Sequence, residues 1–122
     1  MIDERSLSKQ VAEALEWISA KHNVPKPRVS AVNAMLSVNG TIMDGVFIVG
    51  ATEKAQEGEP IILLSRRPRN QIIWVLFHEF YHYRHYLKTG ILPNFIALNS
   101  PEEKDADRFA TIDFRAYNSM LK

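Results

Sequence analysis

Apolar residues recur at helical spacing near the start of the chain. They are separated by polar positions and are Leu7, Val11, Leu15 and Ile18. This spacing is typical of an amphipathic helix with one buried face. We therefore predict a helix from about Ser6 to His22, which Pro25 and Pro27 end.

The next part of the chain alternates short apolar runs with turn residues. Two dipeptides, Asn39-Gly40 and Asp44-Gly45, are signals for tight hairpin turns, and the pattern leaves open which of them makes the turn. The strands that the pattern predicts lie at about 29–36, 45–51 and 60–65.

A second helix is predicted from about Gln71 to Lys88, with Asn70 as its N-cap and Gly90 just beyond its end. Its apolar residues lie on nearly every side, and they are Ile72, Ile73, Trp74, Val75, Leu76, Phe77 and Phe80. A helix that is apolar nearly all round packs on several sides. We expect it to lie at the centre of the fold.

A third helix begins near residue 100. Ser100 is its predicted N-cap, Pro101 occupies the first helical position, and acidic residues fill the first turn. The chain of 122 residues suits one domain. We predict an α+β fold in which a small twisted sheet of about three strands packs against the central helix, with one helix N-terminal and one C-terminal to it.

The absence of cysteine restricts the chemistry. It excludes disulfides, thiolate metal sites and cysteine nucleophiles, so any metal must be bound by His, Asp or Glu. The net formal charge of +1 does not favour nucleic acid as a partner, and no run approaches the ~20 apolar residues of a membrane span. The start of the chain lacks the apolar region of a secretory signal. We expect a cytoplasmic protein.

The central helix contains the motif His78-Glu79-Phe80-Tyr81-His82, an HExxH. Residues four apart lie on the same face of a helix, so the two imidazoles can bind one metal ion. Glu79 follows the first histidine and can act as a general base on a water molecule held at the metal. The alternative is a helix with two ordinary histidines and a salt-bridged glutamate.

Downstream, the chain reads "EKDADRFA" from Glu103 to Ala110. HExxH followed by a helix of the form ExEADxFA resembles the signature of the gluzincin metallopeptidases. The resemblance covers about residues 60–117 and is closest to the minigluzincins and the small ImmA/IrrE-type proteins. Asp105 replaces the second glutamate of the pattern.

This resemblance implies a zinc-dependent endopeptidase that acts on a peptide or protein substrate. It implies Glu103 as the third zinc ligand and Asp107 as the outer carboxylate that orients His78. Gluzincins hold substrate in extended form along an exposed edge strand, for which the segment 45–51 is our candidate.

Glu103 also has a purely structural interpretation. Ser100 to Glu103 reads as a capping box, in which Glu103 would only close the start of the helix. Glu102 and Asp105 are alternative candidates for the third ligand.

Other residues offer weaker signals. His85 follows His82 by three positions and is a further ligand candidate, and Tyr117 is a candidate for stabilising an oxyanion. Tyr81, Tyr83 and Tyr86 are expected to be packing residues. Arg66, Arg67 and Arg69 form a basic turn that we interpret as solvated.

Two rival functions remain open from the sequence. One is a zinc-binding domain that keeps the metal but lacks a usable cleft and works beside a regulatory protein partner, as ImmA/IrrE-type proteins do. A variant of this function is a latent enzyme whose C-terminal tail "YNSMLK" occupies the cleft. The other is a basic binding module in which the HExxH is coincidental. Metal content separates the second rival from the other two functions.

Overall fold

The computed structural model describes residues 4–32, 36–38, 41–50, 58–65, 70–92 and 100–121. Its elements, in chain order, are α1 (Glu4–His22), β1 (Arg28–Val32), β2 (Leu36–Val38), β3 (Thr41–Met43), β4 (Gly45–Val49), β5 (Pro60–Ser65), α2 (Ile72–Thr89) and α3 (Pro101–Leu121). None of these helices is both long and apolar enough to cross a membrane.

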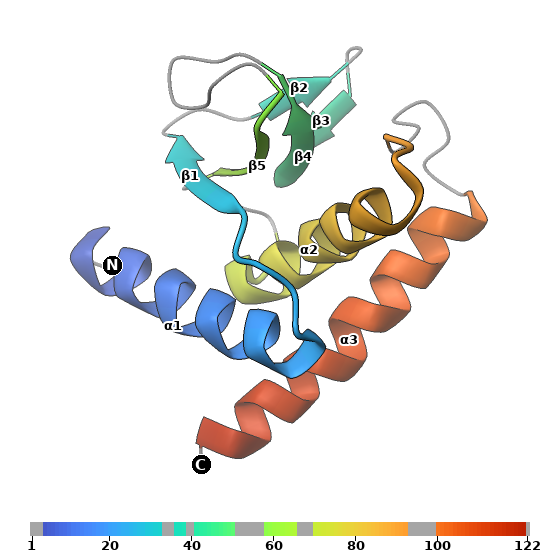
Figure 1. Cartoon of the computed structure of the whole chain (residues 1–122). Coiled ribbons are helices and arrows are strands. Elements are labelled where there is room, and N and C mark those ends of the chain that lie inside the picture. Colours follow the sequence, from blue (N-terminus) through green and yellow to red (C-terminus); the bar gives the residue numbers. More distant parts are fainter. Residues whose placement is uncertain are drawn as a thin grey trace.

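Helix α2 lies at the centre of the fold (Figure 1). One side of it faces β4 and β5, and its other sides contact α1 and α3. The principal sheet has the order β1-β5-β4, with β1 parallel and β4 antiparallel to β5. The predicted α+β class is therefore confirmed, including a three-stranded sheet packed against the central helix.

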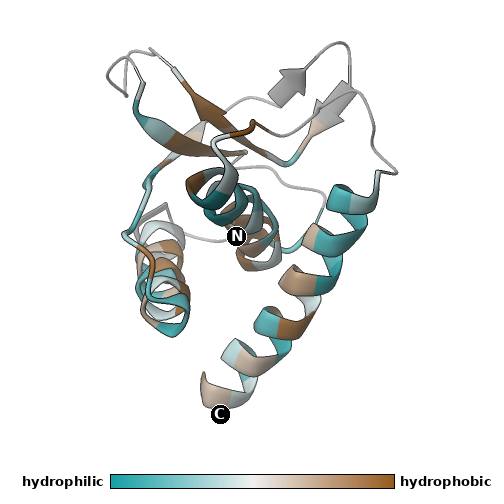
Figure 2. Cartoon of the chain, turned by 45° about the vertical axis from the view of Figure 1, so that its right-hand side comes forward, coloured by the Kyte–Doolittle hydropathy of each residue, from teal (hydrophilic) through white to brown (hydrophobic). Residues whose placement is uncertain are grey.

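The core forms where the sheet and the other two helices meet α2. Seven buried positions of α2 are apolar or aromatic, and they are Ile72, Ile73, Val75, Leu76, Phe77, Phe80 and Tyr83. Figure 2 shows hydrophobic segments in the strands beside α2, while α3 carries hydrophilic residues along much of its length. This burial explains why α2 is apolar nearly all round.

The strands differ from the prediction between residues 29 and 43, where β3 (Thr41–Met43) and most of β2 were not predicted. The segment expected as one strand over 29–36 contains β1, which ends at Val32, and the start of β2, which pairs with β3 in a separate sheet. The pairing of Val38 with Thr41 leaves two positions between these strands, where the Asn39-Gly40 signal lies; those two residues are outside the described ranges. Asp44-Gly45 makes no hairpin, because β3 and β4 belong to different sheets.

The start of α2 is shifted by one residue from the prediction. Gln71, not Asn70, is the N-cap, and its side chain accepts hydrogen bonds from the backbone N–H groups of Ile73 and Trp74. Asn70 instead donates twice to the carboxylate of Asp44, from its backbone and its side chain. The C-terminal prediction holds, since Gly90 adopts the left-handed conformation that ends the helix.

Helix α3 is anchored to the end of α1 by a buried carboxylate. Asp113 on α3 lies 2.6 Å from Nζ of Lys21 and 2.7 Å from Nε2 of His22. A buried carboxylate needs such partners to offset its lost hydration. This contact links the middle of α3 to the end of α1, beside the larger contact of α3 with α2.

Candidate metal centre

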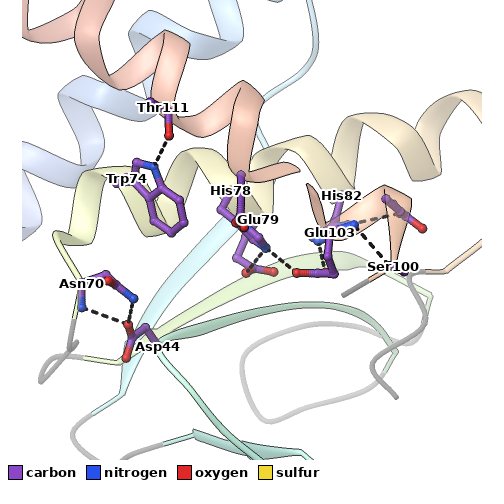
Figure 3. Close-up of polar contacts among 11 residues, drawn as sticks. Asp44, Asn70, Trp74, His78, Glu79, His82, Ser100, Glu103 and Thr111 are labelled. Atoms are coloured by element: carbon purple, nitrogen blue, oxygen red, sulfur yellow. Dashed lines mark hydrogen bonds and ion pairs between the residues drawn. The ribbon is translucent and has the colours of Figure 1, made fainter. Parts of the chain in front are cut away.

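Three side chains of the motif helices converge on one point (Figure 3). His78 and His82 lie on one face of α2, and Glu103 reaches them from the first turn of α3. One donor atom from each of the three residues lies within 4.8 Å of the other two. Among the described residues, this is the group of histidine and carboxylate side chains that could hold a metal ion.

Of the two roles that the sequence suggested for the Glu103 side chain, the structure supports the contact with the histidines and not the closing of the helix start. The backbone N–H of Glu103 donates to Oγ of Ser100 at 3.2 Å, so Ser100 caps the helix as predicted. Its carboxylate, however, points to α2: Oε2 lies 3.1 Å from Nε2 of His78, and Oε1 lies 2.7 Å from Nε2 of His82. The side chain is therefore directed to the two histidines.

Each histidine also has a carboxylate near its other ring nitrogen. Oδ1 of Asp107 lies 2.8 Å from Nδ1 of His78, although that nitrogen has no partner with hydrogen-bond geometry among the described residues. Oε1 of Glu102 is hydrogen-bonded to Nδ1 of His82 at 3.2 Å. The sequence suggested the first contact but not the second, because an acidic residue in a first helical turn is common without any such role.

Glu79 is buried on the side of α2 that faces β4. It is only 4% exposed, and its Oε2 lies 3.8 Å from Nε2 of His78. The backbone N–H of Phe47 donates a hydrogen bond to its carboxylate. Gly45 allows this close approach, because a Cβ there would lie 2.8 Å from Val75 and 3.2 Å from Cγ of Glu79.

Strand β4 is an edge strand of the principal sheet. Asp44 and Gly50, which flank it, each make a backbone hydrogen bond toward the β5 side, with Ser65 and Glu59. Backbone groups of successive residues point to alternate sides of a strand, so odd-numbered residues of β4 direct theirs away from β5. On that side no described strand pairs with β4, and we call it the free edge. The N–H of Phe47 lies on this edge, and it donates the hydrogen bond that the Glu79 carboxylate accepts.

The electrostatics of the metal-free cluster join the histidines to Glu103. Burial works to lower the pKa of His78, but the hydrogen bond to Glu103 and the neighbouring carboxylates outweigh it and raise the pKa to about 9. The pKa of His82 is raised in the same way, against burial, chiefly by Glu103. Burial works to raise the pKa of Glu103, yet its two histidine partners lower it to about 2. Burial raises the pKa of Glu79.

These shifts define the pH range in which the metal-free cluster stabilises the fold. The contribution of His78 is complete below its ordinary pKa of 6.5 and is lost as pH rises through about 9. The contribution of Glu103 is complete above 4.5 and is lost as pH falls through about 2. Both contributions are complete only between pH 4.5 and 6.5.

Zinc binding is expected to release protons and to tighten as pH rises. At pH 7 the metal-free protein holds a proton on His78, because the pKa of this group is about 9, and only the neutral ring is a ligand. Affinity should rise roughly tenfold per pH unit for each proton displaced. Calorimetric titration in two buffers of different protonation enthalpy counts the protons. Zinc binding without proton release at pH 7 would contradict this prediction.

The donor set fits zinc. Two imidazole nitrogens and a carboxylate oxygen are the ligands of many hydrolytic zinc sites, with bonds of about 2.0–2.2 Å. Such bonds separate neighbouring ligand atoms by roughly 3.3 Å in a tetrahedral site, and Glu103 lies 3.1 and 2.7 Å from the two Nε2 atoms. With all three donor atoms within 4.8 Å of one another, the spacing is compatible with one shared ion.

Three other candidates lie away from the cluster. His85 stacks against Tyr81, with ring centroids 6.2 Å apart, and is not part of the metal-binding group. Asp105 is exposed and lies 3.7 Å from Arg108. Tyr117 is buried in the core and is about 21 Å from Glu103 along the axis of α3, so the idea that it stabilises an oxyanion at this site is wrong.

The C-terminal tail is not folded over the cluster. The segment 117–121 forms the last turn of α3, at the end opposite Glu103 (Figure 1). Occupation of the cleft by this part of the tail is therefore excluded as a source of latency within one chain. The basic turn at Arg66, Arg67 and Arg69 lies outside the described residues.

Comparisons with protein-family models, with curated proteins and with solved structures each found no match for this chain. The resemblance to gluzincins therefore depends on the motif residues and on the convergence of His78, His82 and Glu103.

Proposed function

We propose that this protein is a zinc-dependent peptidase of gluzincin type. The observation that carries the proposal is the convergence of His78, His82 and Glu103, with the buried carboxylate of Glu79 beside them. Zinc, when bound, polarises a carbonyl group and lowers the pKa of a water molecule to about 7. A structural zinc site would need four protein ligands, whereas three residues meet here among those described.

Glu79 is the proposed general base. Its carboxylate faces the Nε2 atom of His78, on the side where substrate and water would meet the metal. The backbone N–H of Phe47 donates a hydrogen bond to the same carboxylate from β4. Glu79 would take a proton from the attacking water and deliver it to the leaving amine.

The free edge of β4 is the proposed site for the substrate backbone. An extended peptide can add to such an edge through main-chain hydrogen bonds. The N–H of Phe47 is already used by Glu79, so pairing would use its C=O and both backbone groups of Val49. The peptide would then lie beside the general base.

The test combines metal analysis with cleavage of an unstructured peptide library. We expect one zinc per chain and cleavage that stops when zinc is chelated and returns when zinc is restored. Less than stoichiometric zinc after loading, or preferential retention of iron, which favours the same donor set, would refute the metal assignment. Full zinc loading without cleavage of any peptide would favour the non-catalytic zinc-binding function.

A further inference from the structure

Two adjacent carboxylates from the first turn of α3 meet one histidine. Glu103 lies at Nε2 of His82 and Glu102 lies at Nδ1, at 2.7 and 3.2 Å. We propose that Glu102 is a positioning residue for His82: it accepts the Nδ1–H and so directs Nε2 to the metal. This inference rests on the metal-binding part of the proposed function and does not depend on peptidase activity.

The chemistry of a neutral imidazole requires such a partner. A ring that binds a metal through Nε2 carries its proton on Nδ1, which must then donate to an acceptor. His82 is only 2% exposed, so water is a poor substitute. An N–H left without an acceptor at a buried position costs free energy. Glu102 supplies the acceptor from a helix that is already held against α2.

Glu102 is better placed than the corresponding residue at the other histidine. The side chain of Glu102 is 29% exposed, and that of Asp107 is 58% exposed. Glu102 has hydrogen-bond geometry to its imidazole, whereas Asp107 is close to His78 without it. A less solvated and better aligned partner fixes a ring more strongly. We therefore expect removal of Glu102 to weaken zinc binding at least as much as removal of Asp107.

The neighbouring Asp105 provides a matched control. It is another acidic residue near the start of α3, but it is exposed and contacts Arg108. Zinc affinity is measured for the parent and for Glu102→Ala, Glu102→Gln and Asp105→Ala. Glu102→Ala removes the acceptor and should weaken zinc by ~10–100-fold. Glu102→Gln keeps a neutral acceptor and should recover part of this loss, and Asp105→Ala should change affinity by less than about threefold.

A spectroscopic measurement separates positioning from a general structural role. In the zinc-loaded parent, the Nδ1–H proton of His82 should give a resolved NMR signal that exchanges slowly with water. In Glu102→Ala that signal should broaden or disappear, while the amide spectrum of α1 and the sheet stays unchanged.

Two outcomes would overturn the proposal in different ways. If the parent binds zinc tightly and Glu102→Ala binds it as well as Asp105→Ala does, Glu102 has no positioning role and the metal site stands. If the parent binds no zinc, the proposed function fails and the role of Glu102 fails with it. If Glu102→Ala loses helical circular dichroism, Glu102→Gln takes its place in the comparison with the parent. Equal zinc affinity of Glu102→Gln and the parent, with an unchanged Nδ1–H signal, would then show that His82 does not need a charged acceptor.

Discussion

Replacing Glu79 with Gln is expected to lower peptide cleavage by ~10²–10⁴-fold, the contribution typical of general acid–base catalysis, and to leave zinc bound. The amide of Gln has the shape of the carboxylate but cannot take a proton. It can still accept the hydrogen bond from Phe47 N–H that Glu79 accepts. Cleavage rates and zinc content of the purified variant and parent, measured on the same preparations, check both parts of the prediction.

Loss of folding would not explain this result. Burial raises the pKa of Glu79, which means that the ionised carboxylate is disfavoured in its surroundings. A neutral Gln avoids that cost, so thermal unfolding of the variant should occur at the same temperature as that of the parent or higher. Glu79→Asp is the matched control, because it keeps a proton acceptor but shortens its reach, and should retain more activity than Gln. Equal cleavage by the Gln variant and the parent would exclude Glu79 as the base.

The helices could be predicted because their signals are local. Short stretches of sequence are sufficient to predict the apolar surface of α2, its end at Gly90 and the Ser100 cap of α3. The spacing of His78 and His82 fixed their common face for the same reason. The predicted N-cap lies one residue before the observed one, because Asn70 is a good cap by residue type but is bound by Asp44 from another part of the chain.

The strand pairing could not be predicted, because it depends on partners far apart in sequence. Periodicity indicated an extended segment from residue 29 to 36, but it carries no information on the sheets that Val32 and Leu36 join. Residues of β1 pair in parallel with β5, and those of β2 pair with β3. The principal sheet therefore combines one distant parallel pair with one antiparallel pair.

The site residues also divide into those that a local motif predicts and those that depend on contacts between distant parts of the chain. HExxH gave His78, Glu79 and His82, and the resemblance gave Glu103 and Asp107, which the structure brings close to the histidines. Glu102 could not be distinguished from an ordinary first-turn acid, because its contact with His82 depends on the crossing of α2 and α3. Tyr117 shows the reverse error, since its hydroxyl suggested chemistry while its position along α3 places it in the core.

Replacing Glu103 with Gln is expected to weaken zinc binding more than any outer carboxylate change, by more than the ~10–100-fold of such changes. A neutral amide is a poor zinc ligand beside two neutral imidazoles. The start of α3 should survive, because Ser100 is bonded to the backbone N–H of residue 103 and not to its side chain. Titration of zinc into the variant and the parent measures the effect, and circular dichroism checks the helix.

The metal-free variant provides an independent check on the same residue. Of the groups that raise the pKa of His78, Glu103 makes the largest contribution, so its removal should lower that pKa from about 9. Fewer protons should then be released on zinc binding at pH 7, even though the binding is weaker. NMR titration of the His78 ring in the variant and parent would show the shift.

The neighbouring acidic residues of α3 allow a ranking of variants by their loss of zinc affinity. Asp107→Asn should weaken zinc less than Glu103→Gln, because Asp107 lies near Nδ1 of His78 and not at the metal side of the ring. Asp105→Asn should matter least, because Asp105 is exposed on a different side of the helix. If Asp105→Asn were the most damaging of the three, the ligand would lie two residues further along α3. If Glu103→Gln bound zinc as tightly as the parent, the cluster of His78, His82 and Glu103 would not be the metal site.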